Sequence, residues 1–179
     1  MTCIAAFAKD GVVYMAADSA ATDNESFDQV TLKHPKVFER FSMLFGVSGN
    51  LRQQNIVRYF EPEFAWLRCE DPVAHLVRSI VPALEKAFDA AHLMADKRLP
   101  GRMLVGTQGR IFEIDDTFGV SEFDVPFAAI GSGAPYALGA MHAMWTNRVA
   151  DPEMVVLKAV ESAIRFNAAC RGPITLEVK

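Results

Sequence analysis

The chain has 179 residues, of which 51% are apolar, and its 22 acidic and 18 basic side chains give a formal net charge of −4. This length suits one domain with a full hydrophobic core, so we expect a single domain over residues 1–179. The charge provides no global cationic field, and we expect no nucleic-acid partner. No signal peptide opens the chain and no apolar run is long enough to span a bilayer, which predicts a cytoplasmic protein with no membrane partner.

The three cysteines, Cys3, Cys69 and Cys170, are far apart in the chain. Neither they nor the histidines have the spacing of a metal site or of a disulfide framework, so we expect no metal, no cofactor and a reducing compartment. Cys3 is interpreted as a small core residue.

The first predicted element is a hairpin that begins almost at the start of the chain. Two apolar runs, 4–8 and 12–17, flank Asp10-Gly11, which is a strong signal for a tight hairpin turn. The hairpin would place Thr2 at its open end and return Asp18 beside it. If Met1 is removed, Thr2 carries a free α-amine with an unperturbed pKa of about 8, which can act as a base for the hydroxyl. An ordinary edge hairpin would have the same pattern.

The next part of the chain alternates turns with short extended segments. Residues 19–29 are polar without periodicity and predict a loop. Extended structure is predicted over 30–32, 36–41 and 43–47. A helix is predicted over 51–60, with Asn50 as its N-cap.

The second half predicts long helices separated by strands. Asp71-Pro72 predicts the start of a helix that runs to about residue 94, with Pro82 kinking or splitting it, and 99–101 is a stop signal. The remaining predicted elements are strands over 103–107, 110–114, 119–123, 127–130 and 174–178, and helices over 135–145 and from Asp151-Pro152 to about 167. Strand runs that alternate with helix pairs predict sheets packed between helical layers.

Four blocks of sequence carry a family resemblance: 2–22, which includes A-A-D-S-A-A-T, then 34–37, 44–49 and 129–137. In this order and at this spacing they resemble proteasome β-type subunits and the bacterial HslV-type peptidase, which are N-terminal-nucleophile hydrolases. The resemblance implies an α+β fold, a four-layer αββα sandwich with two antiparallel sheets between helical layers.

The resemblance also implies roles for five residues. Thr2 matches the nucleophile, and Asp18 and Lys36 match the aspartate and lysine beside it. A buried ammonium favours loss of the hydroxyl proton, and the carboxylate keeps that ammonium in place. Ser132 matches the serine near the N-terminal amine, and the backbone N–H of Gly49 matches the oxyanion donor.

Some positions depart from the family pattern. Two extra residues between Asp18 and Lys36 make Lys33 a rival for the active-site lysine. The second family aspartate aligns on Ala168, beside Asn167, whose amide could hydrogen-bond to Ser132 but supplies no charge. The alignment predicts substrate-binding residues that suit an uncharged, mid-sized apolar side chain: Ala21, Thr22, His34 and Val47.

We therefore expect a threonine-type endopeptidase subunit that cleaves peptides or unfolded proteins. The resemblance implies self-assembly into stacked hexameric or heptameric rings and a possible ATP-dependent unfoldase as partner. Two alternatives stay open at this point: a catalytically inactive ring or scaffold protein of the same fold, and an amidase that acts on small molecules with the same nucleophile.

Overall fold

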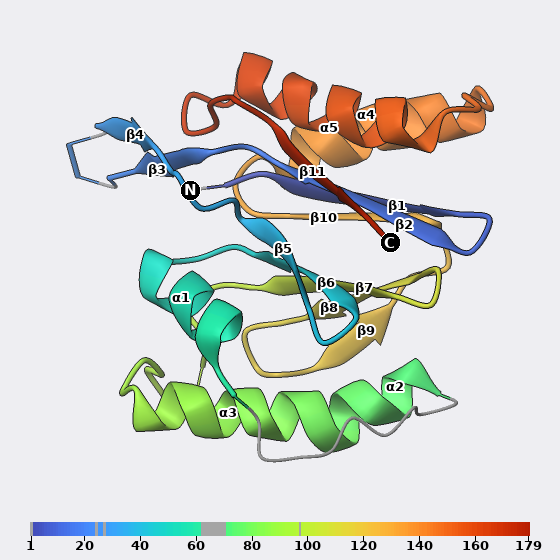
Figure 1. Ribbon diagram of the computed structural model, residues 1–179. Coiled ribbons are helices and arrows are strands. Elements are labelled where there is room, and N and C mark those ends of the chain that lie inside the picture. The colour runs from blue at the N-terminus through green and yellow to red at the C-terminus, as the bar shows by residue number, and fades with distance from the viewer. Residues whose placement is uncertain (1, 24, 27, 62–70, 97) are drawn as a thin grey trace.

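Two antiparallel sheets lie face to face between two layers of helices in the computed structural model, which describes residues 2–23, 25–26, 28–61, 71–96 and 98–179 (Figure 1). The first sheet has the order β10-β1-β2-β11 and the second β5-β6-β7-β8-β9. The predicted α+β class and four-layer αββα sandwich are confirmed.

The first sheet consists of β1 (Ile4–Lys9), β2 (Val12–Ala17), β10 (Phe127–Ile130) and β11 (Thr175–Val178). The second consists of β5 (Val37–Arg40), β6 (Met43–Val47), β7 (Met103–Thr107), β8 (Arg110–Ile114) and β9 (Val120–Glu122). Helices α4 (Ala134–Thr146) and α5 (Pro152–Phe166) cover the first sheet. On the second lie α1 (Leu51–Tyr59), α2 (Pro72–His75), the π-helical stretch η1 (Leu76–Ile80) and α3 (Val81–Ala90).

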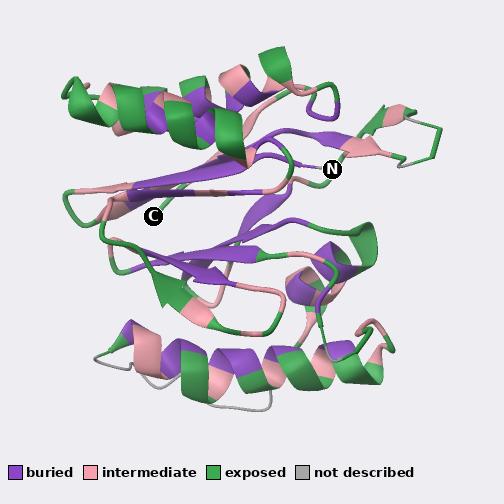
Figure 2. Cartoon of the chain, turned by 180° about the vertical axis from the view of Figure 1, so that it is seen from behind, coloured by how far each residue is buried: buried purple, intermediate pink, exposed green. Residues whose placement is uncertain are grey.

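Three clusters of buried apolar side chains hold the layers together. Figure 2 shows buried residues, in purple, along the strands of both sheets. One lies between α1–α3 and the second sheet, and includes Phe45, Leu84 and Phe112. A second joins α4 and α5 to the first sheet. The third fills the space between the sheets, where Ile4 and Leu104 are fully buried. Because one face of each sheet packs on helices and the other on its partner sheet, both faces of the central strands are apolar.

The hairpin predicted at Asp10-Gly11 is present, and the strands predicted over 103–107 and 110–114 pair as a second hairpin. Asp10 and Gly11 have φ values of 51° and 81°, and Gln108 and Gly109 have 51° and 71°. Positive φ at both central residues matches the right-handed twist of the paired strands, which is why Gly follows Asp or Gln here. The register pairs Ile4 with Ala17, so the two ends of the first hairpin meet.

The predicted helix caps are confirmed. Asn50 Oδ1 accepts a 2.8 Å hydrogen bond from Gln53 N. Asp71 and Asp151 cap α2 and α5 in the same way, each followed by a proline at the first helical position.

Two expectations need correction. The segment 19–29, predicted as a loop, contributes β3 (Ala20–Thr22) and the start of β4 (Gln29–Thr31), which pair as a two-stranded sheet. Contacts with distant residues hold this small sheet, such as the Thr22 Oγ1 bond to Ala169 O, and they leave no local pattern in the sequence. The helix expected to reach residue 94 ends at Ala90, and the π-helical stretch stands directly before Val81-Pro82.

Cys69 lies outside the described residues. Among the helices that are described, none combines the length and apolar character needed to cross a membrane.

Candidate active site

The first hairpin places Thr2 and Asp18 next to each other. Beyond the Ile4–Ala17 pair, Asp18 N donates to Cys3 O at 3.1 Å, and Cys3 N donates to Asp18 Oδ1 at 2.8 Å. Both Thr2 and Asp18 are buried, with exposures of 2% and 0%. Their proximity therefore follows from hairpin register alone.

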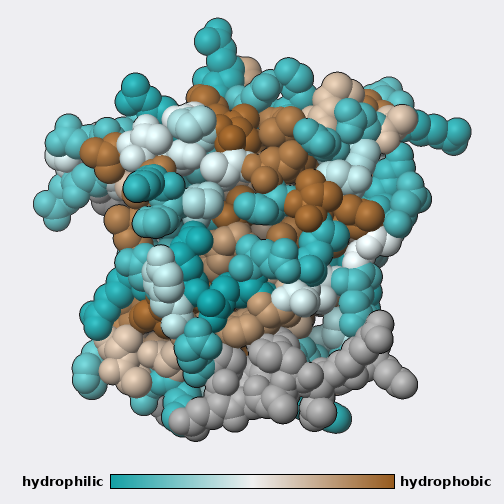
Figure 3. Space-filling model, in the orientation of Figure 1, coloured by the Kyte–Doolittle hydropathy of each residue, from teal (hydrophilic) through white to brown (hydrophobic). Residues whose placement is uncertain are grey.

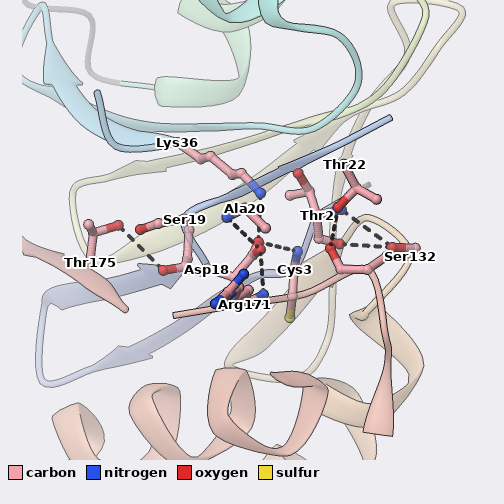
Figure 4. A network of polar contacts seen from close by, with 12 residues as sticks. Thr2, Cys3, Asp18, Ser19, Ala20, Thr22, Lys36, Ser132, Arg171 and Thr175 are labelled. Atoms are coloured by element: carbon pink, nitrogen blue, oxygen red, sulfur yellow. Dashed lines mark hydrogen bonds and ion pairs between the residues drawn. The ribbon is translucent and has the colours of Figure 1, made fainter. Parts of the chain in front are cut away.

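Lys36 reaches this point from the opposite sheet, where it immediately precedes β5. Its Nζ donates to Asp18 Oδ1 at 2.8 Å, and the Lys36 side chain is 1% exposed (Figure 4). Lys33 is exposed on the surface. Of the two lysines that the sequence left open, only Lys36 lies against Asp18.

The Asp18 carboxylate accepts four hydrogen bonds. Besides Lys36 and Cys3 N on Oδ1, its Oδ2 accepts from Ala20 N at 3.1 Å and from Arg171 N at 3.3 Å. A buried charge is tolerated when it is paired and its lone pairs are satisfied, and both conditions hold for this carboxylate. The result is a rigid anion that fixes one cation beside Thr2.

Ser132 lies on the other side of Thr2, in the turn between β10 and α4. Thr2 N donates to Ser132 Oγ at 3.3 Å, and Gly133 N donates to Thr2 O at 3.0 Å. Gly131 has a φ of 92°, and a Cβ at that position would lie 2.2 Å from Thr2 O. Only glycine allows the turn to approach the Thr2 backbone this closely.

Asn167, the C-cap of α5, is hydrogen-bonded to the turn that carries Ser132. Its Nδ2 donates to Ser132 O at 2.8 Å and its Oδ1 accepts from Ala169 N at 2.9 Å. The hydrogen bond to Ser132 considered from sequence is present, and it goes to the backbone carbonyl. A neutral amide can serve both partners at once, because it carries a donor and an acceptor.

An open cleft of about 970 Å³ connects these groups. Thr2, Lys36, Gly49 and Ser132 all line it. Of the predicted substrate-binding residues, Ala21 and Thr22 line the cleft, whereas His34 is exposed outside the lining and Val47 is buried in the core beneath.

Several lining residues were not identified from sequence: Val30, Leu32, Leu51, Gln54, Pro100, Gly101 and Arg102. The stop signal at 99–101 does not predict a place in the site, because nothing local in the sequence connects it to Thr2. Among the described residues, no group of three or more His, Cys, Asp or Glu side chains is placed to hold a metal ion.

The two described cysteines are buried near the site. Burial raises the pKa of the Cys3 thiol far above its usual value, and Cys170 and Asp18 raise it further. Burial, assisted by Asp18, raises the pKa of the Cys170 thiol to about 11. Both stay protonated at neutral pH, so neither supplies the thiolate that a cysteine nucleophile needs.

In sequence, the chain is similar to known protease subunits. No protein-family model matches the chain. It is 30% identical over 178 residues to the ATP-dependent protease subunit HslV of Caldicellulosiruptor saccharolyticus, covering 98% of this chain and 96% of that protein. It is 27% identical over 181 residues to the HslV subunit of Desulfovibrio desulfuricans, covering 98% and 96%.

Solved structures agree with the sequence relatives. Thiobacillus denitrificans BPH in complex with epoxomicin superposes with a TM-score of 0.82 at 26% identity, covering 99% of this chain and 98% of that chain. HslV from Trypanosoma brucei superposes with a TM-score of 0.72 over 99% and 98% of the two chains, and its 18% identity supports the fold alone.

Proposed function

Because the chain belongs to the HslV family of protease subunits, we propose that it is a threonine-type peptidase whose nucleophile is Thr2, once Met1 has been removed. The observation that carries this proposal is the buried Asp18–Lys36 ion pair at 2.8 Å, next to a buried threonine that lines an open cleft. A buried cation beside a hydroxyl lowers the cost of the negative charge that develops as the hydroxyl proton leaves.

In the proposed reaction, Thr2 Oγ1 attacks the carbonyl carbon of the scissile peptide bond. The α-amine of Thr2 accepts the hydroxyl proton and passes it to the leaving amine, so that an ester forms between Thr2 Oγ1 and the acyl part of the substrate. Water, deprotonated by the same amine, then hydrolyses this ester and restores the hydroxyl. Lys36 stays charged throughout, and Asp18 holds it in place.

Two further groups complete the site. The Ser132 hydroxyl contacts Thr2 N, and we expect it to orient the amine toward the neighbouring Oγ1. The Gly49 backbone N–H, at the edge of the same cleft, would donate to the oxyanion of the tetrahedral intermediate. Removing one such donor typically costs about 10²–10³ in kcat.

The cleft supports a peptide substrate rather than a small amide. Its volume of about 970 Å³ has room for several residues of an extended chain, and its walls carry the exposed apolar residues Val30 and Leu51. Val30 belongs to the β3–β4 hairpin, which lines the same cleft as Thr2. We propose that Ala21 and Thr22, on the same hairpin, contact the substrate, with an uncharged apolar side chain before the scissile bond.

We also propose that the subunit assembles into stacked hexameric or heptameric rings. Helix α4 contains no charged residue, yet Tyr136, Leu138 and Trp145 on it are 41%, 37% and 40% exposed. Figure 3 shows apolar surface among polar atoms in the upper half of the view, where α4, α5 and β11 lie. Burying such a face against other copies is favourable. Since the curated relatives are named ATP-dependent, an ATP-driven unfoldase is the expected partner.

Intact mass and peptide hydrolysis test the proposal together. The purified protein should lack the mass of Met1, cleave unfolded casein, and bind epoxomicin, the compound present in the T. denitrificans complex. Thr2→Ala should abolish cleavage, whereas Thr2→Ser should retain part of it. A Thr2→Ala protein that cleaves at the parental rate would exclude Thr2 from the mechanism.

Native mass spectrometry tests the assembly separately. A ring predicts a mass of 12 or 14 subunits for two stacked hexamers or heptamers, and a monomer at micromolar concentration would contradict it. An assembled ring with free Thr2 and no cleavage would instead indicate a scaffold protein.

A further inference from the structure

Gly49 and Gly101 face each other where the β6–β7 ladder ends. The last ladder pair is Val47 with Met103. One step further, Ser48 N donates to Arg102 O at 3.0 Å, Ser48 Oγ donates to the same oxygen at 2.9 Å, and Arg102 N donates to Ser48 Oγ at 3.1 Å. These three hydrogen bonds clamp the two chain segments together at the edge of the cleft. The next pair in this register is Gly49 and Gly101.

The two glycines are in close backbone contact. A Cβ on Gly101 would lie 2.4 Å from Ser48 O, 2.8 Å from Ser48 C and 2.7 Å from Gly49 Cα. These atoms belong to the peptide unit that carries the Gly49 N–H. Gly101 does not have the left-handed φ that favours glycine, so space alone requires a glycine there. Backbone atoms in a clamped turn cannot move aside as a flexible side chain can.

Gln53 also packs closely against Gly49. Gly49 has a φ of 113°, and a Cβ at Gly49 would lie 2.4 Å from Gln53 Oε1. The Gln53 side chain is fully buried in the first turn of α1, and Asn50 caps its backbone N–H. The same added Cβ would lie 3.2 Å from Gly101 Cα, so Gln53 and Gly101 together confine Gly49.

We propose that Gly101 is a positioning residue for the oxyanion donor: the absence of a side chain at Gly101 lets the Ser48–Gly49 peptide settle where the Gly49 N–H points at the reacting carbonyl. The inference rests on the proposed function, because it takes Gly49 N–H as that donor. An oxyanion donor must lie about 2.7–3.1 Å from the oxygen that it stabilises. A displacement of about 1 Å can cost roughly 10²-fold in rate.

The first test is Gly101→Ala, with Gly106→Ala as the matched control. Gly106 lies on the adjoining strand β7, also lacks a left-handed φ, and its added Cβ would lie 2.7 Å from Val13 Cγ1 in the core between the sheets. Both variants thus insert a methyl group into a tight space, but only Gly101 touches the Gly49 peptide. We expect Gly101→Ala to lower kcat by about 10- to 100-fold with KM within about threefold. Gly106→Ala should keep the parental kcat per folded molecule.

A transition-state analogue gives a readout that a general loss of stability would not change. A peptide aldehyde forms a hemiacetal with the Thr2 hydroxyl, and its oxygen occupies the oxyanion position. Its inhibition constant should rise in Gly101→Ala by about the same factor by which kcat/KM falls. In Gly106→Ala the constant should stay at the parental value.

Ser48→Ala is the second variant, and it carries the test if Gly101→Ala does not fold. It removes the two Ser48 Oγ bonds to Arg102 without adding volume, and we expect kcat to fall more than KM rises. Parental kcat and aldehyde affinity in the folded variants of an active enzyme would overturn the inference and leave the proposed function intact. A parent protein with exposed Thr2 that cleaves nothing would overturn the proposed function and this inference with it.

Discussion

The amino group of Lys36 and the carboxylate of Asp18 form a 2.8 Å ion pair in which both side chains are almost completely buried. They come from different sheets: Asp18 follows β2 and Lys36 precedes β5. The ion pair therefore links the two sheets beside Thr2, at the open end of the first hairpin. The stability of the fold and the proposed reaction therefore both depend on this ion pair.

Lys36→Ala should reduce both activity and stability. It leaves the Asp18 carboxylate buried without its cation, and breaking a buried pair in this way costs about 3–5 kcal/mol. We expect kcat to fall by about 100-fold or more, since the charge beside Thr2 is lost. Urea unfolding and peptide hydrolysis measure the two effects, and exposed Lys33→Ala is the control that should change neither. A Lys36→Ala enzyme with parental kcat would exclude Lys36 from the reaction.

Asn167→Ala should lower kcat about threefold to tenfold, because losing one or two hydrogen bonds of about 1 kcal/mol each loosens the turn that carries Ser132. Asn167→Asp should be at least as harmful, since a carboxylate cannot donate to the Ser132 carbonyl. The control is Asn147→Ala, which removes a similar amide bond to Ala143 O at the end of α4. An Asn167→Asp enzyme faster than the parent would show that charge at this position matters more than the hydrogen bond.

Gln29→Ala should raise KM about threefold to tenfold and change kcat by less than twofold. Gln29 Nε2 donates to Thr22 Oγ1 at 3.3 Å and to Ala168 O, and so fastens the β3–β4 hairpin that forms one wall of the cleft. Each lost bond is worth about 1 kcal/mol. Steady-state kinetics with a long peptide measure KM and kcat separately. The control is Thr31→Ala, on the exposed part of β4. An equal fall in kcat would place the effect at Thr2 instead.

Cys3 and Cys170 should resist alkylation in the folded protein. Burial raises the pKa of both thiols, that of Cys170 to about 11, so at about pH 8 almost no thiolate is present to react. Iodoacetamide should leave both cysteines unmodified until the chain is unfolded, as peptide mass mapping of the treated protein would show. Rapid modification of Cys3 at neutral pH would make it a competitor of Thr2 as nucleophile.

Local patterns in the sequence are sufficient to predict most of the helices and strands and part of the candidate site. Asp10-Gly11 and Gln108-Gly109 mark the two hairpins, and Asn50, Asp71 and Asp151 mark helix starts, because turn and cap chemistry acts over a few residues. The proximity of Thr2 and Asp18 can be predicted in the same way, because the register of the first hairpin brings the two residues together.

The tertiary structure decided the rest, because the remaining contacts join residues that are far apart in the chain. Only the packing of one sheet on the other selects Lys36 over Lys33 as the partner of Asp18. A bond from Thr22 Oγ1 to the distant Ala169 O likewise holds the β3–β4 hairpin. The bond from Asn167 to Ser132 O and the contact of Gly101 with Gly49 also join residues that are far apart in the chain. Such contacts form where layers meet, and a periodic pattern of apolar residues shows which face is buried but not which residue lies opposite.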